Sequence, residues 1–337
     1  QLLARSDLNL IVIDEDAQQV AALRERLHRA GLYGIRASAH VGDPFSYPLP
    51  PYMAHLIVSE DWAQADSSGQ AIVETVFHPL RPYGGTACLA IAAAERERLL
   101  KEFADSGPAE PSVRQAGELL LVSREGPLPG SAPWSHGDAN AANTGASEDR
   151  FLTAPMELLW FDGPARWIRT PGATLVRVAG GRMFLKAQNL IAVDVFTGRR
   201  LWEVALPFPH TVIDQMIAID DAIYITGDRT CFVIDPATGR EMKRIELPAE
   251  MDQPWSNLRV EREFLIGQSG PHLLCLNRAS SQIVWQYECG CPSLSVAVGN
   301  GRVFCAEQAN KRRANTQTYT RAYKLETGKL VWQQPGG

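Results

Sequence analysis

The spacing of hydrophobic residues changes about 125 residues into the chain. In the first part, short apolar runs alternate with segments in which apolar residues recur every three or four positions. This pattern predicts strands over residues 9–14, 35–41, 54–58, 86–92 and 118–124, and helices over 17–30, 70–80 and 95–103. Such alternation favours a mostly parallel sheet flanked by helices, with ligands bound beyond the carboxyl ends of the strands.

A different pattern follows the stretch REGPLPGSAPW at residues 124–134, whose prolines and glycines predict a linker. Beyond it, short runs rich in Val, Ile, Phe and Tyr lie between Gly, Asp, Asn and Pro turns, which is typical of all-β proteins. We therefore expect an α/β domain over residues 1–125, a linker and opening segment over 126–150, and β repeats over 151–337.

The second part contains a repeat that identifies its architecture. Its copies are AVDVFTGRRLW (192–202), VIDPATGREMK (233–243), CLNRASSQIVW (275–285) and AYKLETGKLVW (322–332), preceded by MELLW, which ends at residue 160. The final positions are spaced by 42, 41, 42 and 47 residues. A period near ~40 residues is typical of one four-stranded propeller blade per repeat. The sequence predicts four to five blades in an incomplete ring.

Each repeat combines a tight turn with an aromatic residue. In Asp-x-x-Thr-Gly the carboxylate can accept hydrogen bonds from turn N–H groups, and the glycine supplies a positive φ. The Trp that closes the following strand is expected to pack between neighbouring blades. Lys243 replaces this Trp in one repeat, so we expect a weaker contact between blades there.

Composition narrows the classes of function. The hydrophobic share of 45%, the charged share of 21% and the net charge of −5 are those of an ordinary globular protein, and nucleic-acid or membrane partners are not expected. No apolar run approaches the ~20 residues of a transmembrane helix. The six cysteines leave both free thiols and a disulfide open, and the seven histidines form no metal-binding pattern. Localisation and partners remain open.

The repeat element Ala-x-Asp-x-x-Thr-Gly-x-x-x-Trp, complete at 192–202 and nearly so at 322–332, resembles the tryptophan-docking motif of propellers of the pyrroloquinoline-quinone (PQQ) type. That family includes quinoprotein alcohol dehydrogenases and outer-membrane assembly lipoproteins of the BamB type. PWSHGDANAANTGASEDR at 133–150 resembles the opening segment of such propellers. Quinoprotein dehydrogenases carry adjacent cysteines and calcium ligands that this sequence lacks, so PQQ is not expected and the docking residues are interpreted as structural.

The first part resembles a class I S-adenosylmethionine (SAM) dependent methyltransferase, with a Rossmann-like α/β fold. LIVIDED (10–16), HVGDPF (40–45), AHLIVSED (54–61) and LRPYGGTACLAI (80–91) resemble four successive motifs of that family, beginning with its second strand. The resemblance implies that Asp14 binds the ribose hydroxyls and Asp43 the adenine amino group of SAM. It also implies that Ser59, Glu60 and Asp61 face the methyl donor.

Two of these residues have simpler interpretations, because Asp14 can cap the following helix and Asp43 can form a turn. The family's first strand and its Gly-x-Gly turn are missing from this sequence, so we expect a partial domain within a longer protein.

Together the two parts resemble large planctomycete-type proteins. The predicted function is a methyltransferase-like domain with a propeller as its docking scaffold. The alternatives are a non-catalytic interaction scaffold with a degenerate methyltransferase domain, or a quinoprotein oxidoreductase. Whether the chain is an enzyme, and which residues would be catalytic, stays open.

Overall fold

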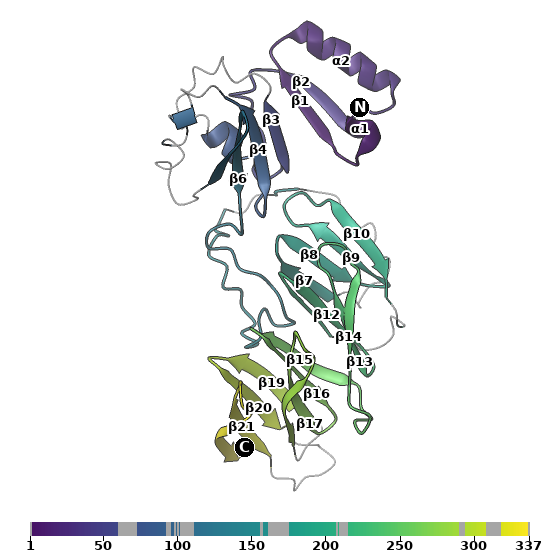
Figure 1. The fold of residues 1–337 in the computed structure, drawn as a ribbon, viewed down its shortest axis with the longest axis vertical. Helices are drawn as coiled ribbons and strands as arrows, with labels where there is room; N and C mark the ends of the chain where they lie inside the picture. The colour runs from purple at the N-terminus through teal and green to yellow at the C-terminus, as the bar shows by residue number, and fades with distance from the viewer. Residues whose placement is uncertain are drawn as a thin grey trace. The chain divides into compact units, whose positions relative to one another are not determined.

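The chain divides into two compact units, Gln1–Pro129 and Gly130–Gly337 (Figure 1). Their structure is a computed structural model. It describes residues 2–59, 73–91, 96–97, 99, 101, 111–155, 158–160, 175–206, 208, 215–289, 294–307 and 318–335.

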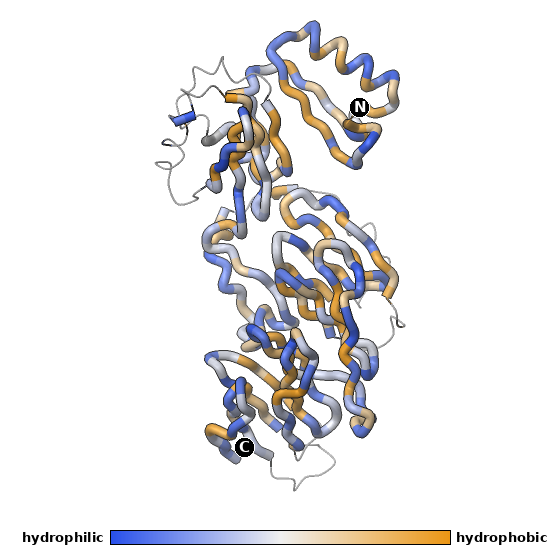
Figure 2. Tube along the Cα trace, in the orientation of Figure 1, coloured by the Kyte–Doolittle hydropathy of each residue, from blue (hydrophilic) through white to orange (hydrophobic). Residues whose placement is uncertain are grey.

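The first sheet of the N-terminal unit is a parallel pair covered by a helix. Its elements are α1 (Leu2–Arg5), β1 (Leu10–Asp14), α2 (Ala17–Arg29) and β2 (Ala37–Val41). Strands β1 and β2 pair in parallel, as expected for strands joined by a helix. Val20 and Leu27, two turns apart on α2, are buried, whereas the other positions of the helix are exposed or half-buried and include its hydrophilic residues (Figure 2). Gly31, at φ 68°, follows the end of the helix, as predicted.

The second sheet has the strand order β3-β4-β6-β5. The elements are β3 (Leu56–Ser59), the π-helical turn η1 (Val73–Phe77), β4 (Gly85–Ala90), β5 (Ser112–Ala116) and β6 (Leu119–Arg124). Strands β3 and β4 are parallel, but β6 is antiparallel to both of its neighbours. The prediction of one mostly parallel sheet is therefore wrong for the described residues, which form two sheets with two parallel and two antiparallel pairings.

The difference arises from a hairpin that the sequence pattern missed. Strand β5 was not predicted, and the two residues Gly117 and Glu118 join it to β6. Gly117 has φ 63°, and a two-residue turn that begins with glycine forces the flanking strands to run antiparallel. Of the predicted helix at 70–80, the described part holds η1, and most of the helix predicted at 95–103 lies outside the described residues.

The described residues of the C-terminal unit form four antiparallel sheets of four strands each, the arrangement of propeller blades. The first blade is β7 (Leu175–Ala179), β8 (Arg182–Lys186), β9 (Asn189–Asp194) and β10 (Arg200–Ala205). The second is β11 (Met216–Ile219), β12 (Ala222–Gly227), β13 (Thr230–Ile234) and β14 (Glu241–Glu246). The third is β15 (Trp255–Glu261), β16 (Phe264–Ser269), β17 (His272–Asn277) and β18 (Ile283–Glu288). The fourth is β19 (Leu294–Gly299), β20 (Arg302–Glu307), β21 (Tyr319–Lys324) and β22 (Leu330–Pro335).

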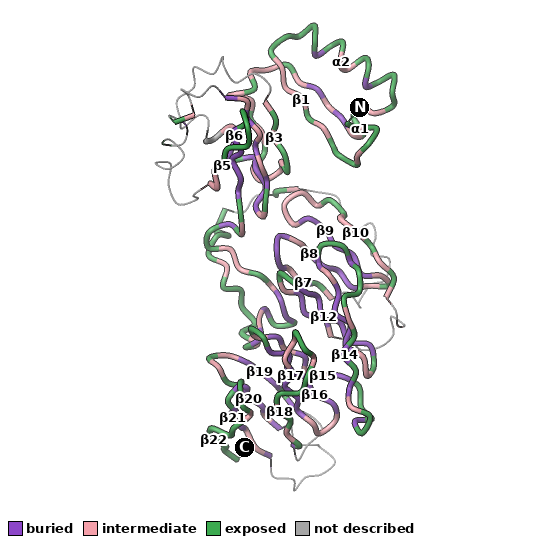
Figure 3. Tube along the Cα trace, viewed as in Figure 1, coloured by how far each residue is buried: buried purple, intermediate pink, exposed green. Residues whose placement is uncertain are grey.

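Neighbouring blades share their hydrophobic cores. Tyr224 of the second blade, for example, lies in one buried cluster with Trp255 and Leu265 of the third. Strands β12 and β16 are buried along their whole length, whereas β22 is exposed throughout (Figure 3). Burial between blades, rather than within one sheet, therefore holds this unit together.

Candidate functional site

The predicted SAM-binding residues lie at the carboxyl ends of strands in the N-terminal unit. Asp14 is the last residue of β1, and Asp43 follows the end of the neighbouring strand β2. A hydrogen bond of 3.0 Å from Gly42 N to Asp14 O ties these two ends together. Ser59 ends β3 in the other sheet. Glu60 and Asp61 lie outside the described residues.

The two simpler interpretations have different outcomes. The cap of α2 is Asp16, not Asp14, because Asp16 Oδ1 accepts hydrogen bonds from the backbone N–H groups of Gln18 and Gln19. These bonds lower the pKa of Asp16. Asp43 does form a turn, since its two carboxylate oxygens accept hydrogen bonds from Phe45 N at 2.8 Å and Ser46 Oγ at 2.7 Å.

The segment that resembles a propeller opening runs along the innermost strands of all four blades. We call residues 134–143 the axial segment. Its hydrogen bonds, of 2.8 to 3.1 Å, join Trp134 to Val178 in β7, Ser135 to Ala218 in β11, His136 to Val260 in β15 and Ala141 to Val298 in β19. The axial segment is thus a common hydrogen-bond partner of blades that are far apart in sequence. It pairs backbone N–H and C=O groups that the edges of the inner strands would otherwise leave exposed.

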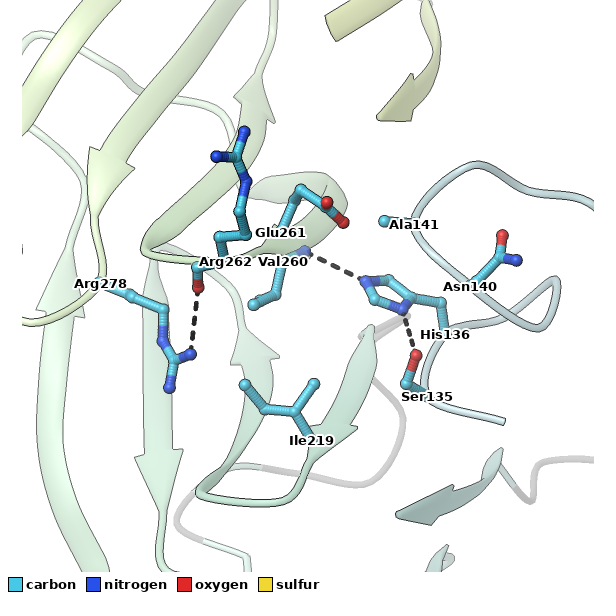
Figure 4. Close-up of a pocket in the computed structure, with 9 residues that line it drawn as sticks. All are labelled: Ser135, His136, Asn140, Ala141, Ile219, Val260, Glu261, Arg262 and Arg278. Atoms are coloured by element: carbon cyan, nitrogen blue, oxygen red, sulfur yellow. Dashed lines mark hydrogen bonds between the residues drawn. The ribbon is translucent and has the colours of Figure 1, made fainter. Parts of the chain in front are cut away.

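His136 is the most constrained side chain of the axial segment. It is 2% exposed, and its Nε2 accepts the N–H of Val260 at 3.1 Å (Figure 4). Its Nδ1 lies 2.7 Å from Ser135 Oγ. Because Nε2 is an acceptor, the proton of the neutral ring resides on Nδ1. Burial first, then the charges of Arg259 and Arg177, lower the pKa of His136 to about 3.

The two arginines occupy equivalent positions on inner strands of alternate blades. Arg177 in β7 precedes Val178, and Arg259 in β15 precedes Val260. Arg177 is 8% exposed and donates through Nε to Met216 O at 2.7 Å. Burial lowers the pKa of both guanidinium groups, and the carboxylate of Asp138 in the axial segment opposes this shift. The positive charges of these two arginines add to the effect of burial, which is the main reason that His136 stays neutral.

A cavity of about 280 Å³ lies beside His136 (Figure 4). Its lining comes from four separate parts of the chain, namely the axial segment, Ile219 at the end of β11, the end of β15 with Arg262, and the turn that holds Arg278. Arg278 lines it as well and donates through Nη1 to Arg262 O at 3.2 Å. We call this cavity the axial cavity. It combines the neutral imidazole of His136, the aliphatic side chains of Ile219 and Val260, and guanidinium groups.

The tryptophans of the repeat dock as predicted at three contacts between successive blade segments. In each, the indole Nε1 donates a hydrogen bond of 2.7 to 3.1 Å to a backbone carbonyl in the Asp-x-x-Thr-Gly turn of the following repeat, or its equivalent. The acceptor is the second residue of that turn. The indole also lies flat on the turn glycine, where an added Cβ would come within 2.4 to 2.7 Å of ring atoms. The pairs are Trp160 with Gly198, Trp202 with Gly239, and Trp285 with Gly328.

The fourth contact, between the second and third blades, is built differently. Lys243 Nζ donates to Arg278 O, to Ala279 O at 2.8 Å and to Ser281 Oγ at 3.0 Å. Arg278 O is the equivalent of the carbonyls that receive the indoles. Ser281, at φ 61°, stands where the other turns have glycine. The sequence predicted that a plug is missing here, but not the polar replacement that joins these blades.

The described residues offer little to a metal ion. No group of three His, Cys, Asp or Glu side chains suited to a metal occurs among them. Five cysteines, Cys88, Cys231, Cys275, Cys289 and Cys305, are free thiols, and Cys291 lies outside the described residues. Burial raises the pKa of Cys231 and Cys275 to about 12, so neither is a reactive thiolate. No described helix is long and apolar enough to cross a membrane.

Comparison with known proteins gives a likeness of fold. No family model matches the sequence, and no curated protein is significantly similar to it. BamB from Moraxella catarrhalis is 16% identical over 47% of this chain and 50% of its own, with a TM-score of 0.33. Hydrazine synthase of Kuenenia stuttgartiensis is 11% identical over 47% and 46%, with a TM-score of 0.37. The quinohemoprotein alcohol dehydrogenase ADHIIG from Pseudomonas putida HK5 is 12% identical over 47% and 33%, with a TM-score of 0.37.

The chain spans half or less of the length of each of these three proteins. The similarity to propellers of the PQQ and BamB type therefore covers about half of this chain and concerns its fold alone.

Several residues of the site were not singled out from the sequence. His136 lay within the segment recognised as a propeller opening, but its single occurrence gave no pattern. Arg177 and Arg259 could have been found by aligning the innermost strands of the repeats. Ser281 replaces glycine in the turn that receives Lys243, and this paired exchange is visible once the four turns are aligned.

Proposed function

We propose that the N-terminal unit is a partial methyltransferase-like domain of the SAM-binding type and that the propeller unit is its docking scaffold. The strand order carries this proposal. Doubly wound sheets have the order 3-2-1-4-5, and their ligands bind at the carboxyl ends where the order reverses. The pairs β2-β1 and β3-β4, which belong to two separate sheets, match the pairs 3-2 and 4-5 of that order. The proposal assigns the position of the first strand to the place between β1 and β3.

The residues at these strand ends fit SAM in part. Asp14 Oδ1 accepts the N–H of Asp16 at 2.7 Å, and Oδ2 has no hydrogen-bond partner among the described residues. Asp14 can therefore accept from ribose hydroxyls, whereas Asp43 has both oxygens engaged in its own turn and could accept a further donor only through its remaining lone pairs. When bound, SAM supplies an activated methyl group. The chain's part is to hold the adenosine moiety.

The affinity for SAM is expected to be weak. Among the described residues β1 pairs with β2 alone and β3 with β4 alone, so each of the two strands has one edge without a strand partner. Ile11, Leu56 and Val58 on these strands are 42%, 53% and 62% exposed, an unusual degree for apolar residues of a parallel sheet. A strand between them would order the carboxyl ends that the cofactor needs.

Saturation-transfer NMR with SAM tests this proposal at the weak affinity expected. Transfer to the adenine and ribose protons is predicted for the folded chain and should fall in the Asp14→Asn variant. Asp16→Asn is the matched control. It removes the same negative charge at a position two residues from Asp14, and asparagine can still cap the helix. Equal transfer in both variants, or none in a folded chain, would overturn the methyltransferase interpretation.

A second candidate is a non-catalytic interaction scaffold with a degenerate methyltransferase domain. The axial cavity favours it, because four separate parts of the propeller unit converge on that cavity without any contribution from the predicted SAM-binding residues. Absence of SAM binding by a folded chain that still binds a partner through its propeller would support the scaffold.

A further inference from the structure

The contact between the second and third blades, here called the lysine seam, departs from the other seams on both of its sides. Elsewhere an indole lies on a glycine, whereas Lys243 faces Ser281. The two exchanges belong together, since a Cβ at the turn position would collide with a docked indole but can coexist with the slim lysine stem. The three ammonium donors are used by the three acceptors of the turn.

A cavity of about 640 Å³ accompanies this exchange. Its walls come from both blades, with Tyr224, Val233 and Met242 on one side and Ala279 on the other. Lys243 also lines it, and Met242 is 59% exposed at its margin. The volume falls within the ~300–1,000 Å³ that ligand pockets of proteins occupy. The lysine seam thus has an open slot in place of a filled interface, with apolar walls bordered by charged residues that include Asp221 and Glu263.

Arginine side chains border this slot. Arg278 is fixed across the seam, because it donates through Nε to Tyr224 Oη at 3.0 Å and pairs with Asp221. Arg262 is exposed, and its guanidinium makes no hydrogen bond or ion pair with any described residue. Both arginines also line the axial cavity, so the two cavities share a border. A free guanidinium beside an apolar slot is suited to the face of an aromatic ring.

We propose that the lysine seam binds an aromatic side chain of a partner polypeptide. At the other seams this chain fills the equivalent place with a planar indole of its own. Here Ser281 bars the docked pose, so the incoming ring enters beside Arg278 and Ala279, against Val233 and Met242. Since the lysine donors are already satisfied and Arg278 is paired, the site favours a neutral ring with a peptide backbone over a free anion.

Saturation-transfer NMR with N-acetyltryptophanamide tests the site, with N-acetylleucinamide as a control for general apolar binding. Transfer to the indole protons is expected for the first compound and not for the second. The double variant Lys243→Trp/Ser281→Gly rebuilds the seam used elsewhere in the chain, so it should fold while losing this transfer. Equal transfer before and after the double change would overturn the proposal, as would equal transfer to both compounds.

Two further measurements separate the partner class and guard against a misfolded variant. Free indole is compared with N-acetyltryptophanamide, and binding of indole alone would overturn the assignment to a polypeptide. Arg262→Ala changes an exposed residue and should weaken binding about two- to fivefold through the lost cation–π contact. Unchanged affinity in Arg262→Ala would contradict its role at the border of the slot. A SAM titration is unaffected by any of these changes, which keeps this test distinct from that of the proposed function.

Discussion

Acidification should weaken the propeller unit through His136. The ring is buried and neutral, and its pKa is lowered from the ordinary value of 6.5 to about 3. At every pH between these two values, His136 is therefore more protonated in the unfolded chain than in the folded chain. Stability falls as the pH decreases through this window and is at its full value above pH 6.5.

The size of the effect follows from the two pKa values. A difference of one pKa unit corresponds to ~1.4 kcal/mol, so moving from pH 7.5 to pH 5 should cost about 2 kcal/mol of the free energy of unfolding. When the titration is complete, near pH 3, the total loss in the free energy of unfolding should be about 5 kcal/mol. Protonation at Nε2 would also remove the acceptor of the Val260 N–H and separate the axial segment from the third blade.

Urea unfolding followed by tryptophan fluorescence measures this, since seven of the eight tryptophans lie after residue 130. His136→Gln is the informative variant, because glutamine can accept the Val260 N–H and does not titrate. It should lose some stability at pH 7.5 but show a dependence on pH that is smaller by about 2 kcal/mol down to pH 5. Identical pH dependence in the variant and the unchanged chain would refute the reasoning, since carboxylates titrate equally in both.

Substitutions at four further residues test the elements described above. Gly239→Ala places a Cβ within 2.7 Å of the Trp202 ring and strains a φ of 72°, so we expect a loss of about 1–3 kcal/mol in urea unfolding. Trp285→Ala should cost about 3–5 kcal/mol, whereas Trp332→Ala, on an exposed strand, should cost less than about 1.5 kcal/mol; equal losses would contradict the docking role. Asp16→Ala removes the cap of α2 and should cost about 1 kcal/mol, with Asp16→Asn close to neutral by thermal unfolding.

Local chemistry made much of this fold predictable from the sequence alone. The repeat of about 40 residues predicted the blades because each blade carries its own turn and docking residue. The parallel pair β1 and β2 and the helix between them followed from hydrophobic spacing, because each element buries one face or stripe. The hairpin of β5 and β6 escaped because Ser112–Ala116 is mostly polar and exposed, and its pairing depends on a neighbour rather than on its own pattern.

The candidate site depended more on tertiary structure. The sequence placed Asp14 and Asp43 at the carboxyl ends of strands, since each residue ends or follows an apolar run that predicts a strand. It could not bring His136 beside Val260, Arg177 and Arg259, because these residues are up to 124 positions apart and meet only when the blades surround the axial segment.

The lysine seam shows the same division. The sequence determined that Lys243 stands in a tryptophan's place, since the position is fixed by the repeat. Only the tertiary structure decided the consequence of this exchange. It places the Lys243 ammonium in hydrogen-bonding contact with the turn that holds Ser281, and it leaves a cavity beside that contact. The physical reason is that a turn and a docking residue are encoded within one repeat, whereas the space between two blades belongs to neither of them.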